Sequence, residues 1–246
     1  MVRKFIAHFK SVDDSDKTKA VDLLIRESTG DFDFYFFVVL SVLMATLGLI
    51  ADSGAVVIGS MLLAPILFPV LSVSLSFIMS DADLIVRSIM TLIKATVLSI
   101  GVSILATLIL APFPELTSEI LQRTEPSLVY AGIAVVAGMA VAYALARPDL
   151  SVTLPGIAVS VALIPPLATV GVGLASLSWS VVAGAFTLYM VNVLGIIFAS
   201  MLVFSFMDLY TKRSIATKTA EEEEERQEEI AEKIDTNKEV IPRPKP

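Results

Sequence analysis

The chain has 246 residues, of which 55% are hydrophobic and only 17% charged, and its mean hydropathy is +0.80. This composition excludes an ordinary soluble domain and indicates a membrane protein whose main partner is the lipid bilayer. The net charge of −7 lies mostly in the terminal segments and leaves no basic surface for nucleic acid. Because there is no cysteine, disulfides, thiol catalysis and thiolate metal sites are excluded.

The first expected unit is a cytoplasmic N-terminal segment, residues 1–33. Within it, the stretch "TKAVDLLIRES" places Val21, Leu24 and Ile25 on one helical face. This pattern predicts an amphipathic helix that lies either on the membrane surface or on the protein's own cytoplasmic face. The segment has no signal-peptide pattern, so we expect it to remain in the mature protein.

Six apolar stretches follow, each near the length of about 20 residues that a helix needs to cross a bilayer. They lie at 34–51, 54–79, 84–111, 127–146, 151–176 and 179–206. With six spans, both termini lie on one side together with Arg87 and Arg147, which fall in the second and fourth loops. Since cytoplasmic segments carry the excess of Lys and Arg, we expect a multi-pass protein of the cell membrane with both termini cytoplasmic.

Two of the six stretches resemble each other. The sequences "SMLLAPIL" at 60–67 and "SVALIPPL" at 160–167 share serine, leucine and proline positions. The two sequences are 100 residues apart, and the same offset of 100 approximately relates a first unit, 34–111, to a second unit, 127–206, within a transmembrane domain at 34–206. A unit of three spans enters the membrane from opposite sides in its two copies, so the repeat would be inverted, as in many secondary transporters. The expected fold is an all-α membrane protein of six transmembrane helices in two inverted three-helix repeats.

The prolines of these stretches predict interruptions of the second and fifth helices. Pro65 and Pro69 lie in the second stretch, and Pro165 and Pro166 in the fifth. A proline inside a helix removes a hydrogen bond and costs about 3 kcal/mol in soluble hosts. In a bilayer, freed backbone groups are tolerated only where protein or a water-filled cavity covers them. The prolines therefore mark either functional breaks beside a cavity or kinks that serve packing, and the paired prolines of the fifth helix favour a true break there.

Two polar residues lie deep in the predicted spans, Lys94 in the third and Asn192 in the sixth. Ionisable groups at such depth are expensive and often functional. With the four prolines, Lys94 and Asn192 form our candidate site for a small solute or ion, and the charge of Lys94 favours an anion. The alternatives are that Lys94 extends its long stem to water and that Asn192 only forms hydrogen bonds between helices.

Small residues recur every four positions in the fourth span, at Ala134, Gly138, Ala142 and Ala146. Such a series lets another helix approach closely. The partner is either another helix of the same chain or a neighbouring subunit, and we expect a homo-oligomer.

The C-terminal segment, 207–246, contains the acidic run "EEEEERQEEIAEK" and is expected to be a solvated, partly disordered cytoplasmic tail. The only histidine, His8, lies outside the spans. A HExxH metal site and a Ser/His dyad are therefore excluded, and we expect no enzymatic activity, no cofactor and no metal.

Three stretches together carry a resemblance to a known family. They are "GLIADSGAVVIGSMLLAPILFPVLSVSLSF" at 48–77, "LPGIAVSVALIPPLATVGVGLA" at 154–175 and "VNVLGII" at 191–197. The chain resembles the bacterial and archaeal membrane family catalogued as an uncharacterised hydrophobic domain, a domain of unknown function. Ser60 stands where that family is expected to have Ala, and Phe68 stands where it is expected to have Gly, which would narrow a cavity there. The resemblance implies a duplicated hydrophobic core and brings no substrate.

These features favour a transporter or channel for a small solute or ion, with its site near the broken helices at the repeat interface. The alternative is a non-transporting membrane scaffold or sensor that acts through its cytoplasmic tails.

Overall fold

The computed structural model describes residues 12–112, 115–147, 150 and 162–240. Across these ranges the regular structure is helical, with no β-strand, as the sequence predicts. Four of the described helices are long and apolar enough to cross a membrane. They are α3 (Phe32–Ile50), α6 (Ala82–Leu110), α8 (Leu128–Leu145) and α11 (Trp179–Phe206). The all-helical, membrane-embedded architecture is thus confirmed, whereas the six spans, the inverted repeat and the side on which the termini lie stay predictions.

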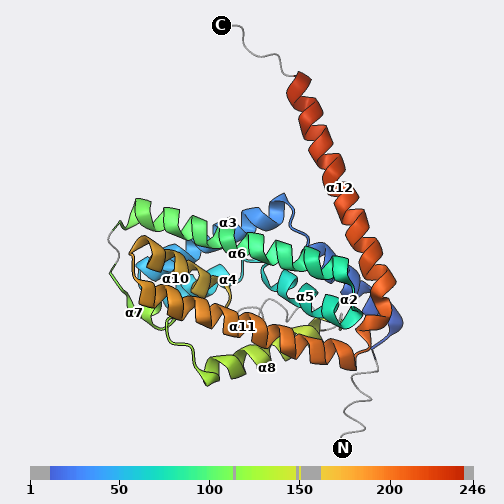
Figure 1. Cartoon of the computed structure of the whole chain (residues 1–246), viewed down its shortest axis with the longest axis horizontal. Coiled ribbons are helices and arrows are strands. Elements are labelled where there is room, and N and C mark those ends of the chain that lie inside the picture. The colour runs from blue at the N-terminus through green and yellow to red at the C-terminus, as the bar shows by residue number, and fades with distance from the viewer. Residues whose placement is uncertain (1–11, 113–114, 148–149, 151–161, 241–246) are drawn as a thin grey trace, which may run out of the picture.

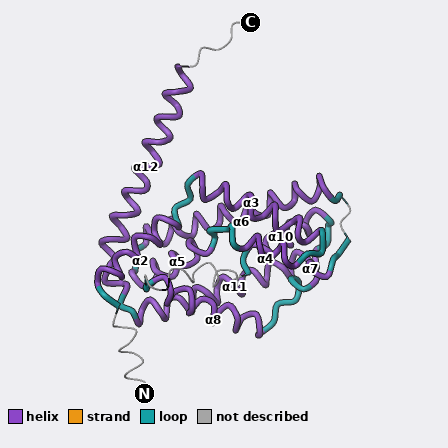
Figure 2. The backbone as a smooth tube through the Cα atoms, turned by 180° about the vertical axis from the view of Figure 1, so that it is seen from behind, coloured by secondary structure: helices purple, strands orange, loops and turns teal. Residues whose placement is uncertain are grey.

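The four long helices extend along the long axis of the molecule (Figure 1). At one end lie α2 (Asp14–Glu27), the 3₁₀ helix η2 (Leu209–Lys212) and the beginning of α12 (Arg213–Val240). We call this the α12 end. The short helix α7 (Ser118–Leu121) lies at the opposite, α7 end, where Thr117 donates its hydroxyl to the Leu49 carbonyl at 2.7 Å. The distal half of α12 projects away from the bundle in both views (Figures 1 and 2).

Acidic N-caps set where two of the long helices begin at the α12 end. The Asp31 side chain accepts a hydrogen bond from the Phe34 backbone N–H at 2.8 Å and so caps α3. The Asp81 side chain does the same for the Leu84 N–H at 3.2 Å and caps α6. Each carboxylate satisfies a backbone donor that has no intrahelical partner and complements the positive helix end.

The predicted second span is divided into two helices, α4 (Gly54–Met61) and α5 (Leu67–Met79). Pro65 lies in the connection between them, and Pro69 lies in the first turn of α5, where a missing N–H removes no helical bond. The Ser60 carbonyl at the end of α4 accepts hydrogen bonds from the Leu63 N–H at 3.1 Å and from the Ser41 hydroxyl of α3 at 2.6 Å. This acceptor is therefore satisfied, although the Leu62 and Leu63 side chains of the interruption are exposed.

The described part of the predicted fifth span is α10 (Ile164–Ala175). Pro165 and Pro166 lie in its first turn, where proline is readily accommodated. The prolines predict the interruption at Ile164 and Pro165, but Ile164 is the first residue of α10. Residues 151–161 are outside the described residues, so an interruption of a longer fifth helix stays a prediction. In the structure these two prolines begin a helix.

The small residues of α8 pack against α11 of the same chain. A Cβ atom added at Gly138 would lie 2.8 Å from the Ile196 Cα, and one added at Gly195 would lie 2.9 Å from the Ala134 Cβ. Ala142 and Ala146 are also fully buried. The close approach that the series allows is therefore made within the chain, and the homo-oligomer stays a prediction.

The two terminal segments form helices that pack on the bundle and on each other. Val21, Leu24 and Ile25 of α2 are buried, and α2 contacts α5, η2 and α12. The sequence left two positions for this amphipathic helix, the membrane surface and the surface of the protein itself. In the structure it packs on the protein. The acidic run of α12 is helical, and its beginning is docked on α2 instead of being free in solvent.

Candidate functional site

The residues of the predicted site lie in three different places in the structure. Lys94 lines a polar cavity at the α12 end, Pro65 lines an apolar cavity beside α8, and Asn192 contacts the segment just before α10. Pro69 is buried in α5. The predicted site therefore divides into one polar cavity and two proline segments.

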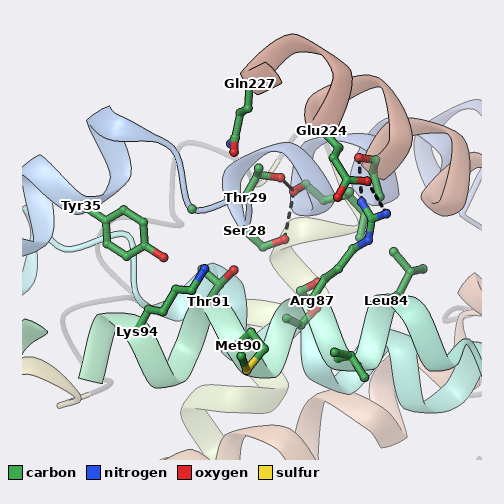
Figure 3. Close-up of a pocket in the computed structure, with 16 residues that line it drawn as sticks. Ser28, Thr29, Tyr35, Leu84, Arg87, Met90, Thr91, Lys94, Glu224 and Gln227 are labelled. Atoms are coloured by element: carbon green, nitrogen blue, oxygen red, sulfur yellow. Dashed lines mark hydrogen bonds and ion pairs between the residues drawn. The ribbon is translucent and has the colours of Figure 1, made fainter. Parts of the chain in front are cut away.

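The polar cavity has a volume of about 320 Å³ and lies between α2, α6 and α12 (Figure 3). Its polar lining comes from these three helices, from the turn that follows α2, and from Tyr35 of α3 and Ser72 of α5. The other polar side chains of the lining include Ser28, Thr29, Arg87, Thr91, Lys94 and Gln227. The cavity therefore lies where the two terminal segments meet α6, a helix that is long and apolar enough to span a membrane.

Two cations of α6 line the cavity. Lys94 lies seven residues after Arg87, so the two side chains share one helix face about 10 Å apart along the axis. At 1.5 Å per residue, Lys94 lies about 18 Å along α6 from its first residue. The cavity therefore extends along α6 well beyond its first turns. The described residues offer Lys94 neither a hydrogen bond nor an ion pair, although its side chain points into the cavity (Figure 3).

Arg87, unlike Lys94, already has partners on α12. One Nη donates to the Ala220 carbonyl at 3.2 Å, and the other contacts the Glu224 carboxylate at 2.5 Å. The side chains of this ion pair are 41% and 56% exposed, so solvent screens the interaction. A carboxylate of the chain itself is thus paired with one of the two cations of the cavity.

A third donor is contributed by α12. The side chain of Gln227 extends toward the cavity, and its Nε2 is buried without a hydrogen-bond partner among the described residues (Figure 3). The hydroxyls of Ser28 and Thr29 donate to the Ile25 carbonyl at 2.9 Å each, so their protons are used locally. Lys94, Gln227 and the hydroxyls of Tyr35 and Thr91 are therefore the donors of this cavity that have no partner among the described residues.

Ion pairs hold α12 and η2 to α2. Glu223, whose side chain is only 6% exposed, pairs with Arg26 of α2 and with Arg226. Lys212 pairs with Asp14. Together these contacts fix the segment that covers the cavity.

Asp81 joins the beginning of α6 to α12. Its carboxylate accepts hydrogen bonds from the Arg213 guanidinium at 3.0 Å and from the Thr217 hydroxyl at 3.2 Å. Burial raises the pKa of Asp81, but the Leu84 N–H, Arg213 and Thr217 outweigh burial and hold the pKa below its ordinary value. Asp81 is therefore ionised at neutral pH.

The cavity beside Pro65 is of a different chemical kind. It measures about 240 Å³ and is lined by apolar side chains of the α4–α5 connection, α5 and α8, including Phe68, Val141 and Leu145. Phe68 stands at this cavity, where the sequence departs from the motif. The proline interruption thus lies beside this apolar cavity, and Pro65 also lines a charged cavity of about 360 Å³ together with Arg26, Asp31, Glu223 and Arg226.

Asn192 occupies a backbone acceptor that proline leaves open. Pro166 has no N–H, so the Ala162 carbonyl four residues earlier has no helical donor. The Asn192 side chain of α11 donates to that carbonyl at 2.7 Å and is itself 5% exposed. This geometry is the hydrogen bond between helices that the sequence left as the alternative to a ligand contact.

Comparison with known proteins places these features in a family. A family model described as a domain of unknown function, DUF389, matches residues 61–198. The chain belongs to this family. An uncharacterized protein of Methanocaldococcus jannaschii is 31% identical to it over 171 residues, which are 68% of this chain and 52% of the relative. The chain therefore spans about half the length of that curated relative, and no solved structure matches it.

Only some of the residues that line the polar cavity of this DUF389 protein lie inside the matched region. Arg87 and Lys94 lie inside the matched residues, whereas Glu224 and Gln227 of α12 lie outside them. Sequence reasoning found Lys94 but missed the α12 residues, because five successive glutamates give no sign of which one contacts an arginine. The available sequence signal is the charged stripe of Asp83, Arg87 and Lys94 on one face of the predicted third span, which favours polar or anionic partners nearby.

Proposed function

We propose that this DUF389 protein is a transporter or channel for a small anion and that the polar cavity at the α12 end is its binding site. The observation that carries the proposal is Lys94, a lysine without a partner among the described residues, in a cavity that extends along a membrane-spanning helix. A charged side chain within a span costs about 2.5–3.5 kcal/mol on insertion scales, and a bound anion offsets that cost. The volume of about 320 Å³ suits a small ligand.

A row of buried hydroxyls supports a route inward from the cavity. Ser88, Ser99, Ser103 and Thr107 are buried along α6, which runs from the α12 end toward the α7 end. Ser103 donates to the Ala168 carbonyl at 2.7 Å and accepts from the Thr46 hydroxyl at 3.0 Å, so the row is shared with α10 and α3. Polar groups of this kind could line a path for an ion when the helices move apart.

A membrane scaffold or sensor that acts through its terminal helices is the second candidate. The observation that favours it is that Pro65 borders an apolar cavity and that Asn192 satisfies the carbonyl before Pro166. In this reading the ion pairs between α2 and α12 would carry the signal, and Lys94 would extend to water.

Flux measurements in liposomes separate the two functions. Purified full-length protein is reconstituted and screened with chloride, nitrate, sulfate, phosphate, monovalent cations and small metabolites. Under the transport proposal an anion is carried, Lys94→Ala reduces its flux about tenfold, and Lys233→Ala leaves the flux unchanged because Lys233 lies far along α12. If the folded protein carries none of these solutes, the transport proposal is wrong and the scaffold reading replaces it.

A further inference from the structure

The polar cavity contains a carboxylate that occupies the position of an anion. Glu224 of α12 contacts Arg87, while Lys94 on the same face of α6 has no partner among the described residues. We infer that the cavity binds a phosphate group or a similar oxyanion and that Glu224 competes with this ligand for Arg87. The inference rests on the anion site of the proposed function but does not depend on transport.

The donor set fits an oxyanion with several acceptor atoms. Arg87 provides a planar guanidinium that binds two oxygens at once, and Lys94 provides an unpaired ammonium. Gln227 adds an Nε2–H group that is buried without a partner in the described structure. A phosphate group offers several acceptor oxygens to these donors, whereas a halide is a single acceptor atom.

Displacement of Glu224 leaves the docking of α12 in place. The Glu224–Arg87 pair is 56% and 41% exposed, and exposed pairs of this kind contribute little to stability. Glu223 is the neighbouring residue but is 6% exposed and pairs with Arg26 and Arg226. The exposed glutamate can therefore yield to a ligand while the buried one keeps α12 over the cavity.

The side chains around the cavity also bear on the source of the phosphate group. Val86 and Met90 line the cavity and are 60% and 49% exposed on a helix that is long and apolar enough to span a membrane. An opening beside such apolar side chains would admit the headgroup of an anionic lipid as well as a free phosphate ion. The shared chemistry is the phosphate group, and the test distinguishes the two sources.

The test compares two substitutions that remove the same charge from adjacent positions. Glu224→Gln removes the competitor, and Glu225→Gln is the matched control because Glu225 is exposed and makes no ion pair with a described residue. Full-length protein in phosphatidylcholine nanodiscs is titrated calorimetrically with inorganic phosphate at fixed ionic strength, since screening would otherwise vary. We expect Glu224→Gln to bind phosphate about 3- to 10-fold more tightly than Glu225→Gln. We expect Lys94→Gln to weaken binding about tenfold.

A second arm identifies a lipid as the source. The same variants are placed in nanodiscs that contain phosphatidylglycerol and no free phosphate, and their thermal stability is measured. If a lipid headgroup is the ligand, phosphatidylglycerol stabilises Glu224→Gln more than Glu225→Gln, and the phosphate titration in these discs becomes flat. If the two variants behave alike in both arms, the inference is wrong. Phosphate binding without anion flux would overturn the transport proposal alone, and flux without a Glu224 effect would overturn the competition alone.

Discussion

The polar cavity under α12 and the apolar cavity beside Pro65 differ in what lines them. The first is built where the terminal helices meet the charged face of α6, and the second is built where α4 and α5 separate beside α8. A proline interruption changes the backbone but adds no charge or hydroxyl, and neighbouring side chains cover its freed acceptors. Pro65 also lines a charged cavity, but the charged side chains of that cavity come from α2, α12 and the beginning of α3 and not from the α4–α5 connection. In this bundle the charged side chains of neighbouring elements therefore decide the chemistry beside a helix break.

The largest expected effect tests whether Asn192 is structural. Replacing Asn192 by Leu leaves the Ala162 carbonyl without its donor, because Pro166 has no N–H to supply one. We expect a loss of about 1–3 kcal/mol in the free energy of unfolding, measured by denaturation in detergent. Phosphate affinity of the folded variant should not change, since Asn192 does not line the polar cavity. A stable variant that has lost anion binding would move the site back to the proline segment.

The second effect tests the polar cavity directly. Lys94→Gln keeps the length of the polar side chain approximately but removes the charge that has no partner among the described residues. We expect anion affinity to fall about tenfold, equivalent to about 1.4 kcal/mol, with little change in unfolding free energy. Calorimetric titration measures the affinity, and Lys233→Gln is the control for the loss of one positive charge. If Lys94→Gln and Lys233→Gln bind the anion equally well, the polar cavity is not the anion site.

Much of the fold could be predicted from local patterns. The apolar runs of α3, α6, α8 and α11 and the buried face of α2 follow from composition and periodicity alone. The series of small residues in α8 is equally local, although its partner α11 is not. Boundaries set by a proline, such as the gap between α4 and α5, also have a sequence signal.

The polar cavity could not be predicted, because it depends on pairing between distant segments. Arg87 and Glu224 are 137 residues apart, and no periodicity relates them. The acidic run looks like a solvated tail because its glutamates are chemically identical. Only the docking of α12 on α2 distinguishes buried Glu223 from exposed Glu225. The same limit led us to combine Lys94 and Asn192 in one site by their similar depth.

A smaller effect concerns the docking of α12 and its dependence on pH. The folded-state pKa of Asp81 lies below its ordinary value of 3.8, so its stabilising contribution is fully present above that value and is lost as the pH falls through the folded-state pKa. Asp81→Asn retains an N-cap for α6 but removes the ion pair with Arg213. We expect a loss of up to about 1 kcal/mol at neutral pH and a weaker decline of stability in acid than in the unmodified protein. Unfolding curves at several pH values measure both quantities.

The smallest effect is expected at Pro65, the residue that first suggested a site. Pro65 lies between α4 and α5, outside any helix, so Ala in its place loses no helical packing and chiefly adds freedom to the unfolded chain. We expect Pro65→Ala to lower the unfolding free energy by less than about 1 kcal/mol. Anion affinity and flux should stay within twofold of the unmodified protein, because Pro65 does not line the polar cavity that contains Lys94. Loss of flux in a folded Pro65→Ala variant would show that the interruption itself takes part in transport. The function could then no longer be assigned to the polar cavity alone.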